Sequence, residues 1–465
     1  MPDYTVPGVY VEEVSIFPFS VHPLSTSKPV FIGYTEKGPK QLTGIFSLTD
    51  FEELFGGPYI DLPAFVVDGN SVSTLNSAPI PESPVFHLYY SLKLYFANGG
   101  GPCYVLSAGR FGKTYNSRKF KKAIRKLQDQ KGPSLIVLTD LGGFEDPHEY
   151  YSVYEEALDV CQKIGNCFTI IDTKFSESNP NDHQANIQEL RSHLGGPHLR
   201  YGAAYYPQLV SYLEHHYSED QVTVIFGEEK MVLRHSDQTI EDDPEKKTES
   251  FYHNDDDRKL NYHAIVNQLN SVHLVLPPSG AVAGVYAYID INRGVWKAPA
   301  GVELNDIERP IINISSAEQE LMNVSPDGKS VNVIRKLTGR GTQIWGARTL
   351  AGNDNEWRYI SVQRLIGMIK GSVEASAQRF VFEPNDANTW NSAKGMIENF
   401  LLGLWRNGAI QGAKQEQAFF VKVGLGETMT QVDIQEGRII IELGVAAVRP
   451  AEFIVIRISL EMSDP

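Results

Sequence analysis

Cysteine is scarce in this sequence: Cys103, Cys161 and Cys167 are the only three in 465 residues. Three thiols cannot all pair with one another, and such sparse usage is typical of a reducing compartment. No apolar run reaches the roughly eighteen residues that a bilayer span needs, and the polar N-terminal segment has no basic stretch followed by an apolar one. We therefore expect a protein that is made in the cytoplasm, with no direct membrane insertion.

An excess of basic charge is also missing. The sequence has 42 Lys and Arg residues against 57 Asp and Glu residues, a net charge of −15. A nucleic-acid-binding protein needs a basic face to displace counterions from phosphates, so we expect no nucleic acid as a partner. The acidic charge is concentrated in residues 236–257, with nine acidic and two basic side chains. We interpret this run as a solvated part of an acidic insertion over about residues 219–261.

No complete catalytic motif is present either. The nearest is Ala108-Gly-Arg-Phe-Gly-Lys-Thr114, between a predicted strand and a predicted helix, followed by a strand that ends at Asp140. This order is typical of a P-loop nucleotide site, but that motif needs glycine five positions before its Gly-Lys pair, where this chain has Ser107. We expect no enzyme, no catalytic residues, no metal and no cofactor. A P-loop-like nucleotide-binding protein stays as the alternative.

Residues 29–348 alternate between short apolar runs and helical patterns. This order predicts an α/β region of strand–helix–strand units. Two polar stretches, 179–186 and 219–261, are expected to be loops or an inserted lobe. The runs short enough for buried strands are 30–33, 103–106, 135–138, 168–171 and 273–276, and helices are expected over 85–96, 118–130 and 150–164.

The last part of the chain, residues 349–465, predicts a compact α+β domain. Residues 357–379 have a helical pattern, and a second helix over 389–407, capped by Asn388, carries a wide apolar stripe. Three strands are expected to follow. They lie at 418–423, 438–443 and 453–462, and the last alternates between apolar and polar side chains.

The first 28 residues predict an extended arm. Its opening stretch, residues 4–13, favours a β-strand, but Pro18, Pro23 and Pro29 interrupt the sequence that follows, so no hairpin partner is at hand. A lone strand cannot satisfy its own backbone groups. This strand is therefore expected to pair with a distant segment or with another chain.

Motifs spread over the whole chain, in this order, resemble those of contractile tail sheath proteins, the family found in phage tails and extracellular contractile injection systems. Two features depart from the family pattern: the insertion at 219–261, and Ser107-Ala108 at the end of a predicted strand. The matching motifs are Tyr-x-x-Pro-Gly-Val-Tyr-Val-Glu-Glu (4–13), Asn-Gly-Gly (98–100), Tyr-Tyr-Pro (205–207), Gly-Val-Trp-Lys-Ala-Pro (294–299), Gly-Arg-Gly-x-x-x-Trp-Gly-Ala-Arg-Thr-Leu (339–350) and Pro-Ala-Glu-Phe (450–453).

The resemblance implies an architecture for the assembled protein. The C-terminal domain, completed by the N-terminal arm, would form an inner layer around a tube, and the α/β region inserted between them would project outward. Segments near both chain ends would add strands to the sheets of neighbouring subunits. The residues implied in this strand exchange are Tyr4, Pro7, Gly8, Val9, Tyr10, Val11, Glu12, Glu13, Ile454, Ile456 and Ile458.

The resemblance also implies a function and partners. The chain would be a structural subunit that polymerises helically, possibly with paralogous sheath chains, around an inner tube protein, and contracts to drive the tube through a target envelope. Baseplate and terminator or cap proteins would be further partners, and a baseplate or terminator component is an alternative. The particle would be a phage tail or a phage-tail-like particle assembled in a bacterial cytoplasm. The sequence slightly favours the extracellular systems over phage tails and bacteriocins, and a single full-length chain disfavours type VI secretion.

The helix over 389–407 is the candidate contact with the inner tube. Lys394 and Glu398 lie one turn apart on the flank of its apolar stripe, and Arg406 lies nearly opposite the centre of the stripe. These three charges are candidate polar contacts, since a sheath must release its tube. They can equally be ordinary solvated helix charges.

Overall fold

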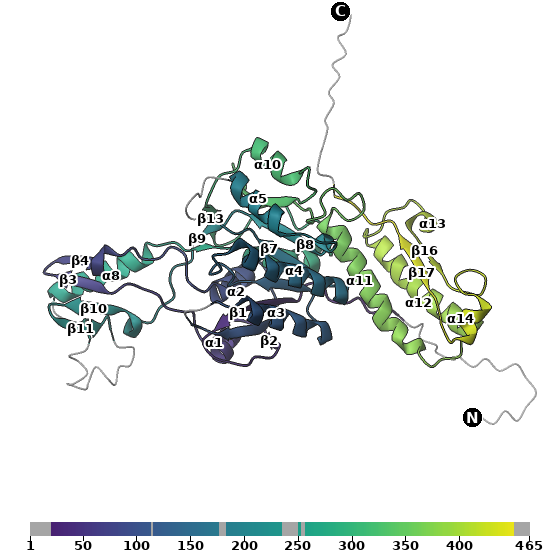
Figure 1. Ribbon diagram of the computed structural model, residues 1–465, viewed down its shortest axis with the longest axis horizontal. Coiled ribbons are helices and arrows are strands. Elements are labelled where there is room, and N and C mark those ends of the chain that lie inside the picture. Colours follow the sequence, from purple (N-terminus) through teal and green to yellow (C-terminus); the bar gives the residue numbers. More distant parts are fainter. Residues whose placement is uncertain (1–19, 113–114, 176–182, 235–249, 253–255, 451–465) are drawn as a thin grey trace, which may run out of the picture. The chain divides into compact units, whose positions relative to one another are not determined.

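The structure, a computed structural model, describes residues 20–112, 115–175, 183–234, 250–252 and 256–450 (Figure 1). The chain forms two compact units. Among the described residues, the large unit contains 25–368 and 449–450, and the small unit contains 20–24 and 369–448. The small unit therefore combines a segment from each end of the chain.

The two units divide inside helix α11 (Ile360–Ala377), at Met368 and Ile369. This point is later in the chain than the predicted boundary after residue 348. The first turns of α11 belong to the large unit because Ile360 is buried in its core. A Cβ placed on Gly367 would lie 3.0 Å from the carbonyl oxygen of Gly165, so the helix also packs closely on the backbone there.

The large unit is built on an eight-stranded sheet with the order β15-β14-β8-β7-β6-β1-β5-β2. Six neighbouring strands, from β14 to β5, run parallel, and the edge strands β15 and β2 are antiparallel to their neighbours. The strand–helix–strand prediction is thus confirmed. The strands are β1 (Pro29–Thr35), β2 (Thr43–Ile45), β5 (Cys103–Arg110), β6 (Leu135–Leu138), β7 (Phe168–Asp172), β8 (Gly202–Tyr206), β14 (Val331–Leu337) and β15 (Gly341–Trp345).

Helices cover both faces of this sheet, which gives three layers (Figure 1). In β1, Val30 and Ile32 pack into the core on one face and Phe31 into the core on the other, because side chains alternate along a strand. The first core includes residues of α3 (Ser117–Arg125), α4 (Pro147–Ile164) and α5 (His183–His193). The second includes residues of α1 (Leu48–Phe55), α2 (Leu88–Ala97) and α9 (Ser279–Arg293).

Small residues let α2 and α9 pack closely together. A Cβ on Gly280 would lie 2.5 Å from the carbonyl oxygen of Ser91, and one on Gly284 would lie 2.5 Å from that of Tyr95. Only glycine fits at these two positions of α9. The sequence Ser-Gly-Ala-Val-Ala-Gly at the start of α9 therefore serves helix packing.

Two sequence predictions for this unit are wrong in detail. The stretch 179–186 was expected to be a loop, but α5 begins at His183 and buries Asn186 and Ile187. The strand expected over 273–276 is the short β12 (Val275–Leu276), which lies outside the main sheet and pairs antiparallel with β9 (Leu209–Ser211). The third strand of that sheet is β13 (Ile307–Pro310), which leads to α10 (Ser316–Asn323).

A lobe within the large unit has its own four-stranded sheet and core. Its strands are β3 (Phe65–Asp68), β4 (Ser71–Thr74), β10 (Thr223–Phe226) and β11 (Glu229–Val232), in the order β11-β10-β3-β4. Helix α8 (Asp256–Asn270) contributes Ile265 and Leu269 to the core that Phe65 and Val224 also form. The described parts of the polar stretch 219–261 thus belong to an inserted lobe, which also contains β3 and β4 from before β5.

The small unit is helical with one short sheet. Helix α12 (Ala387–Arg406) packs against β16 (Phe419–Lys422), which pairs antiparallel with β17 (Glu442–Val445). The helix starts before the predicted Asn388 cap, because the side chain of Asp386 accepts hydrogen bonds from the backbone N–H groups of Asn388 and Thr389. β17 also begins later than the strand expected over 438–443. The unit is completed by the short helices α13 (Gln415–Ala418) and α14 (Gln431–Gln435).

Candidate functional site

The carboxyl ends of the central parallel strands are where a doubly wound fold binds ligands, so the acids there are the first candidates. Asp140 follows β6. Its Oδ1 accepts hydrogen bonds from the backbone N–H groups of His87 (2.5 Å) and Leu88 (3.1 Å), and its Oδ2 accepts one from Tyr34 (2.5 Å). The side chain of His87, the N-cap residue of α2, forms no hydrogen bond with the helix backbone, and the carboxyl of Asp140 binds this helix N-terminus instead. Burial raises the pKa of this carboxyl to about 7.

Asp172, at the end of β7, has the same role for α9. Its Oδ1 accepts a hydrogen bond of 2.9 Å from the backbone N–H of Ser279, the first residue of that helix. Burial raises the pKa of this carboxyl to about 7 as well. A hollow of about 270 Å³ lies at this edge of the sheet, and Asp172 lines it but Asp140 does not. Both acids are therefore engaged in holding helix ends.

The P-loop-like stretch does not form a phosphate-binding loop as far as the structure describes it. β5 continues through Arg110, so Ser107 lies in a strand where the P-loop pattern needs a flexible glycine. The Ser107 hydroxyl is buried and hydrogen-bonds to the hydroxyl of Thr35 (2.8 Å) and the carbonyl of Gly109 (2.9 Å). Lys113 and Thr114 lie outside the described residues. The geometry of residues 107–112 disfavours the nucleotide-binding alternative.

Other chemical sites were searched over the described residues. They contain no group of three or more His, Cys, Asp or Glu side chains that could hold a metal ion. Cys103, Cys161 and Cys167 are buried, free thiols. No helix among the described residues combines the length and apolarity that crossing a membrane requires.

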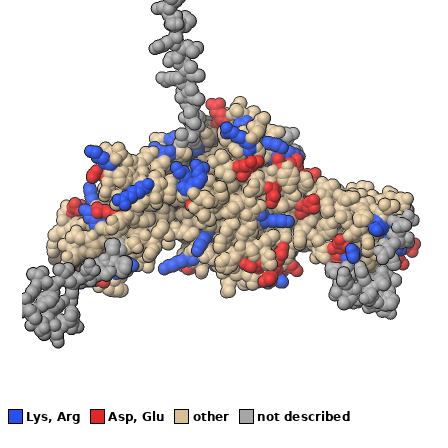
Figure 2. Space-filling view, turned by 180° about the vertical axis from the view of Figure 1, so that it is seen from behind, with Lys and Arg blue, Asp and Glu red and all other residues tan. Residues whose placement is uncertain are grey.

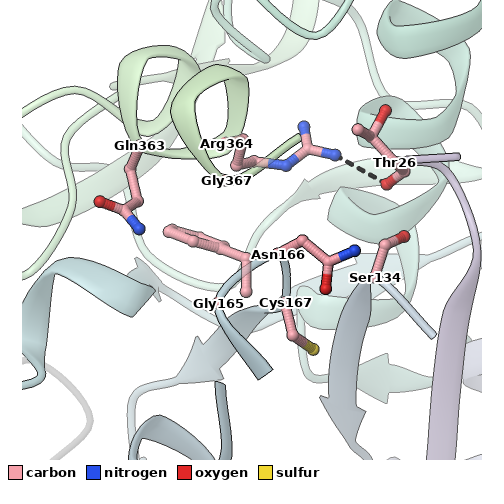
Figure 3. Close-up of a pocket in the computed structure, with 9 residues that line it drawn as sticks. Thr26, Ser134, Gly165, Asn166, Cys167, Gln363, Arg364 and Gly367 are labelled. Atoms are coloured by element: carbon pink, nitrogen blue, oxygen red, sulfur yellow. Dashed lines mark hydrogen bonds between the residues drawn. The ribbon is translucent and has the colours of Figure 1, made fainter. Parts of the chain in front are cut away.

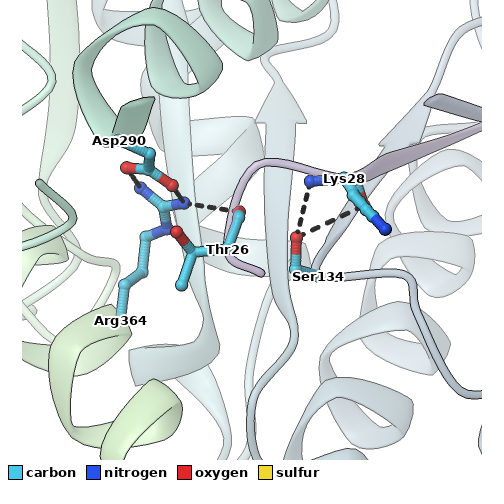
Figure 4. Close-up of polar contacts among 5 residues, drawn as sticks. All are labelled: Thr26, Lys28, Ser134, Asp290 and Arg364. Carbon is cyan, nitrogen blue, oxygen red and sulfur yellow. Dashed lines mark hydrogen bonds and ion pairs between the residues drawn. The ribbon is translucent and has the colours of Figure 1, made fainter. Parts of the chain in front are cut away.

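A buried ion pair fixes the segment that leads into β1. Arg364 on α11 donates from Nη1 to Asp290 Oδ1 (2.9 Å) and from Nη2 to Asp290 Oδ2 (2.5 Å), and Nη2 also donates to the carbonyl of Thr26 (2.9 Å; Figure 4). The guanidinium carbon lies 4.6 Å from the ring centre of Tyr286. A bidentate pair with an aromatic neighbour is the geometry that Arg provides and Lys cannot. An arginine directly before the apolar run Leu365-Ile366 of α11 was the sequence signal that could have predicted a buried ion pair.

The same segment has a second anchor at Ser134. The backbone N–H of Lys28 donates to the Ser134 hydroxyl (3.0 Å), which in turn lies 3.3 Å from the Lys28 carbonyl (Figure 4). Between the anchors is a hollow lined by Thr26, Ser134, Gln363 and Arg364, among others (Figure 3). Its volume of about 10 Å³ is the space of one water molecule. These contacts anchor the segment that leads into β1, and the hollow between them is not a ligand site.

Helix α12 carries the three predicted tube contacts. Ala393, Met396, Ile397, Leu401 and Leu404 are buried, which gives the predicted apolar stripe. Lys394 and Glu398 are half-buried beside this stripe, and Arg406 is exposed. None of these three charges forms an ion pair with another described residue. The structure therefore places them on one helix with free charged groups, and their contact with a tube stays a prediction.

Among its described residues, the small unit has a sheet of two strands. β16 and β17 pair only with each other among the described strands, although two strands alone are marginally stable. Phe419 and Val421 are buried on one face of β16, while Phe420 is exposed on the other and lies over Gly444, where an added Cβ would be 2.3 Å from its ring. Among the described strands, no third strand pairs with either outer edge of this sheet.

Several apolar side chains of the small unit are exposed, which the sequence analysis did not anticipate. Phe382, between α11 and α12, is fully exposed and has a φ of 75°, in the left-handed region that bulky residues rarely adopt. Surface apolar groups of this kind mark protein–protein contacts when they gather on one part of a protein. The others are Val381, Phe420, Leu425, Val432 and Ile440.

The predicted strand-exchange residues lie outside the described residues. This applies to the whole set near the N-terminus, from Tyr4 to Glu13, and to Ile454, Ile456 and Ile458. The described part of the arm begins at Ser20. There, the backbone N–H of Leu24 donates to the buried hydroxyl of Ser372 (2.9 Å), so residues 20–24 are joined to the small unit.

Two protein-family models match adjacent parts of the chain. The phage tail sheath protein central domain matches residues 229–350, and the phage tail sheath C-terminal domain matches residues 352–461. The chain belongs to the phage tail sheath family. The border between the two models lies close to the boundary predicted after residue 348, whereas the compact units divide within α11.

Curated relatives match this sheath chain over a limited stretch. The tail sheath protein of Vibrio phage KVP40 is 24% identical over 153 residues, which are 32% of this chain and 22% of that protein. The tail sheath protein of Enterobacteria phage T4 is 24% identical over 137 residues, 30% of this chain and 21% of that protein. The match thus spans about a fifth of the length of these relatives.

Solved structures match the whole sheath chain. A chain of the extracellular contractile injection system PVC sheath complex in the contracted state is 27% identical, with a TM-score of 0.64, over 99% of this chain and 98% of that chain. A chain of the anti-feeding prophage helical sheath in the contracted state is 28% identical, with a TM-score of 0.63, over 98% of this chain and 99% of that chain. A chain of the anti-feeding prophage baseplate in the contracted state is 26% identical, with a TM-score of 0.66, over 100% of this chain and 99% of that chain. The predicted family and the mixed α/β multidomain fold are confirmed.

Proposed function

We propose that this chain is the structural subunit of a contractile sheath, which polymerises helically around an inner tube and contracts to drive the tube through a target envelope. One observation carries the proposal: the chain matches, over nearly its whole length, sheath chains of two contractile particles in their contracted states. Because these whole-length matches are an extracellular contractile injection system and an anti-feeding prophage, we propose a phage-tail-like particle, assembled in a bacterial cytoplasm, as the setting.

The small unit supports polymerisation by strand addition. Among the described strands its β16 and β17 pair only with each other, and the strand predicted over residues 4–13 has no hairpin partner in the sequence that follows it. Strand addition between neighbouring copies would satisfy both, because main-chain hydrogen bonds supply the affinity and alternating side chains set the register. The alternating strand that contains Ile454, Ile456 and Ile458 is the proposed second donor. The exposed apolar side chains of the small unit would be covered in such an assembly.

A contact that repeats head to tail without closing generates a helix, so one chain can build a long cylinder. The energy for contraction would come from the rearrangement of subunits between two packings. This proposal needs no nucleotide, in keeping with the strand geometry of residues 107–110. The inner tube protein, baseplate proteins and a terminator or cap are the proposed partners, and paralogous sheath chains can share the cylinder.

A baseplate component is the second candidate, because a chain of the anti-feeding prophage baseplate matches this chain equally well. The two functions predict different assemblies: a sheath forms long cylinders, whereas a baseplate component forms a closed ring. Negative-stain microscopy of the purified chain and of its native particle distinguishes them.

Deletion of residues 1–14 tests the proposed strand exchange. The truncated chain should fold, with an unchanged circular-dichroism spectrum, because the described cores include none of these residues. It should fail to form sheaths that sediment on ultracentrifugation. A matched substitution, Lys113→Ala, should assemble and contract normally, and ATP should not change the melting temperature of the full chain. Contracting sheaths of normal length from the truncated chain would contradict strand exchange.

A further inference from the structure

A basic hollow lies between the end of β5 and helix α3. It has a volume of about 480 Å³ and is lined by five cationic side chains, together with Ala108, Phe111 and Ala123. None of the described residues that line it is acidic. The five cations are Lys40, Arg110, Lys119, Lys122 and Lys126, all of them exposed.

The arrangement of α3 gathers these charges on one side. Lys119, Lys122 and Lys126 follow one another at spacings of three and four residues, so they share one face of the helix and the turn after it. Phe120 and Ile124 bury the opposite face in the core. The hollow therefore has a basic wall and a small apolar floor.

None of the five cations forms an ion pair with another described residue, although other basic side chains nearby do. Arg125, on the adjacent face of α3, pairs with Glu156 at 2.6 Å. Within the hollow, Arg110 donates to the carbonyl of Gly38 (2.8 Å) and Lys126 to that of Lys40 (3.2 Å). These two bonds hold the side chains without neutralising them.

Such a concentration of cations is unusual in a chain with a net charge of −15. On the face shown in Figure 2, Lys and Arg lie scattered among Asp and Glu. Five unpaired cations repel one another, and an acidic partner would relieve this repulsion. The negative net charge of the chain disfavours a long nucleic acid as that partner, because the rest of the surface would repel phosphates.

The sequence holds one segment with the complementary chemistry. Residues 237–245 read Asp-Gln-Thr-Ile-Glu-Asp-Asp-Pro-Glu, with five carboxylates and no cation. Ile240 stands among these acids in the sequence. The number and the sign of the charges match those of the hollow.

We propose that the basic hollow of one copy binds the acidic segment 237–245 of a neighbouring copy in the assembled polymer. Because every copy carries one hollow and one acidic segment, the contact is heterologous and repeats along a helix. The inference rests on the proposed function for its setting, a polymer. It adds a specific electrostatic contact between copies to the proposed strand exchange.

Peptide binding tests the hollow without a polymer. A synthetic peptide of residues 236–250 is titrated onto the full unassembled chain at low salt, and its affinity should fall steeply as salt increases. The variant Lys119→Glu/Lys122→Glu should lose about tenfold or more of the affinity for the peptide. The matched control Arg118→Glu/Lys121→Glu has the same charge change on the same helix outside the hollow, and should bind like the parent.

An equal loss of peptide affinity in both variants would show that the peptide responds to the overall charge of the helix and not to the hollow, and would overturn the proposal. So would tighter binding of a DNA duplex than of the peptide at the same salt concentration.

Cross-linking tests whether the contact is between copies. The three native cysteines are buried, so Lys122→Cys and Asp243→Cys introduce accessible thiols. A mixture of these two variants, co-assembled and oxidised, should give a cross-linked dimer that neither variant gives alone. If sheaths assemble normally and no cross-link forms, the proposed contact is wrong and the proposed function stands. A cross-link within a single Lys122→Cys/Asp243→Cys chain, with none between chains, also overturns it.

Discussion

Arg364 and Asp290 meet end-on: each terminal guanidinium nitrogen donates to one carboxylate oxygen, and both side chains are almost completely buried. This pair joins α9 to α11 and also holds the carbonyl of Thr26, two residues before the last anchor of the segment that enters β1. The sheath chain thus secures the base of its N-terminal arm inside the large unit. If the arm transmits force between copies, this buried ion pair is the contact that holds the base of the arm in place.

Arg364→Ala should reduce the free energy of unfolding by about 3–5 kcal/mol, since it leaves the Asp290 carboxylate buried without its partner. Urea unfolding of the unassembled chain measures the loss, and hydrogen exchange should increase at residues 26–35. Arg125→Ala is the control: its pair with Glu156 is exposed on the arginine side, so the loss should be about 0–1 kcal/mol. Equal losses would show that the buried pair has no special role.

The acids that hold the helix ends predict a pH dependence. Burial raises the pKa of the Asp140 and Asp172 carboxyls to about 7, while an unfolded Asp has a pKa of about 3.9. Between these values the folded state binds more protons than the unfolded state, so these groups lower stability as the pH rises from about 4 to about 7. Asp172→Asn should flatten this part of the stability profile, measured by thermal unfolding at each pH. A variant with an unchanged slope would show that Asp172 is ionised in the folded chain.

Glycine packing between α2 and α9 predicts opposite effects of the same substitution at two sites. Gly284→Ala would place a methyl group 2.5 Å from the carbonyl oxygen of Tyr95 and should cost about 1–3 kcal/mol of stability. Gly403→Ala, in α12, has open space around its Cβ and should stabilise the small unit by up to about 1 kcal/mol. Thermal unfolding of the two variants, beside the parent chain, measures both. A stabilising Gly284→Ala would mean that the two helices can separate without loss.

Charge reversal on α12 tests the proposed contact with the inner tube. Lys394→Glu/Glu398→Lys keeps the net charge and should fold normally, but extended sheath should fail to assemble around the tube. Exposed ion pairs are worth about 0–1 kcal/mol each, which suits a contact that many copies share and that must be released. Lys414→Glu/Glu416→Lys is the matched control, since both of these residues are exposed in the same unit. Extended particles of normal yield and salt resistance from the α12 variant would place the tube contact elsewhere.

The sequence was most informative where a strand is buried on both faces. β1, β6 and β7 are nearly continuous apolar runs, as parallel strands covered by helices must be, and each was predicted close to its observed position. β8 was not predicted as a strand because its sequence begins Gly-Ala-Ala. A Cβ at Gly202 would lie 2.6 Å from the side chain of Leu158, so the packing of α4 selects small residues that give no strand signal.

Candidate sites were harder to predict, because the role of each side chain depends on residues that lie far from it in the sequence. Asp140 appeared as the acid of a nucleotide site, yet its hydrogen-bond donors are residues 34, 87 and 88, which no local pattern connects to it. The cations of the hollow come from a loop, a strand and a helix, and only the fold brings them together. Composition predicted an acidic protein and could not show that five of its 42 basic residues gather in one hollow.

The lobe has a consequence for how the protein is made. Its parallel pairing joins Phe65 and Val67 of β3 to Val224 and Phe226 of β10, so the core of the lobe cannot close until the ribosome has passed β10. β3 can pair with β4 at once, but at about 5–20 residues per second it waits roughly ten to thirty seconds for β10 to cover its other edge and close the core. We therefore expect chaperones to bind this part of the nascent chain, and slow decoding between β5 and β10 should increase its aggregation.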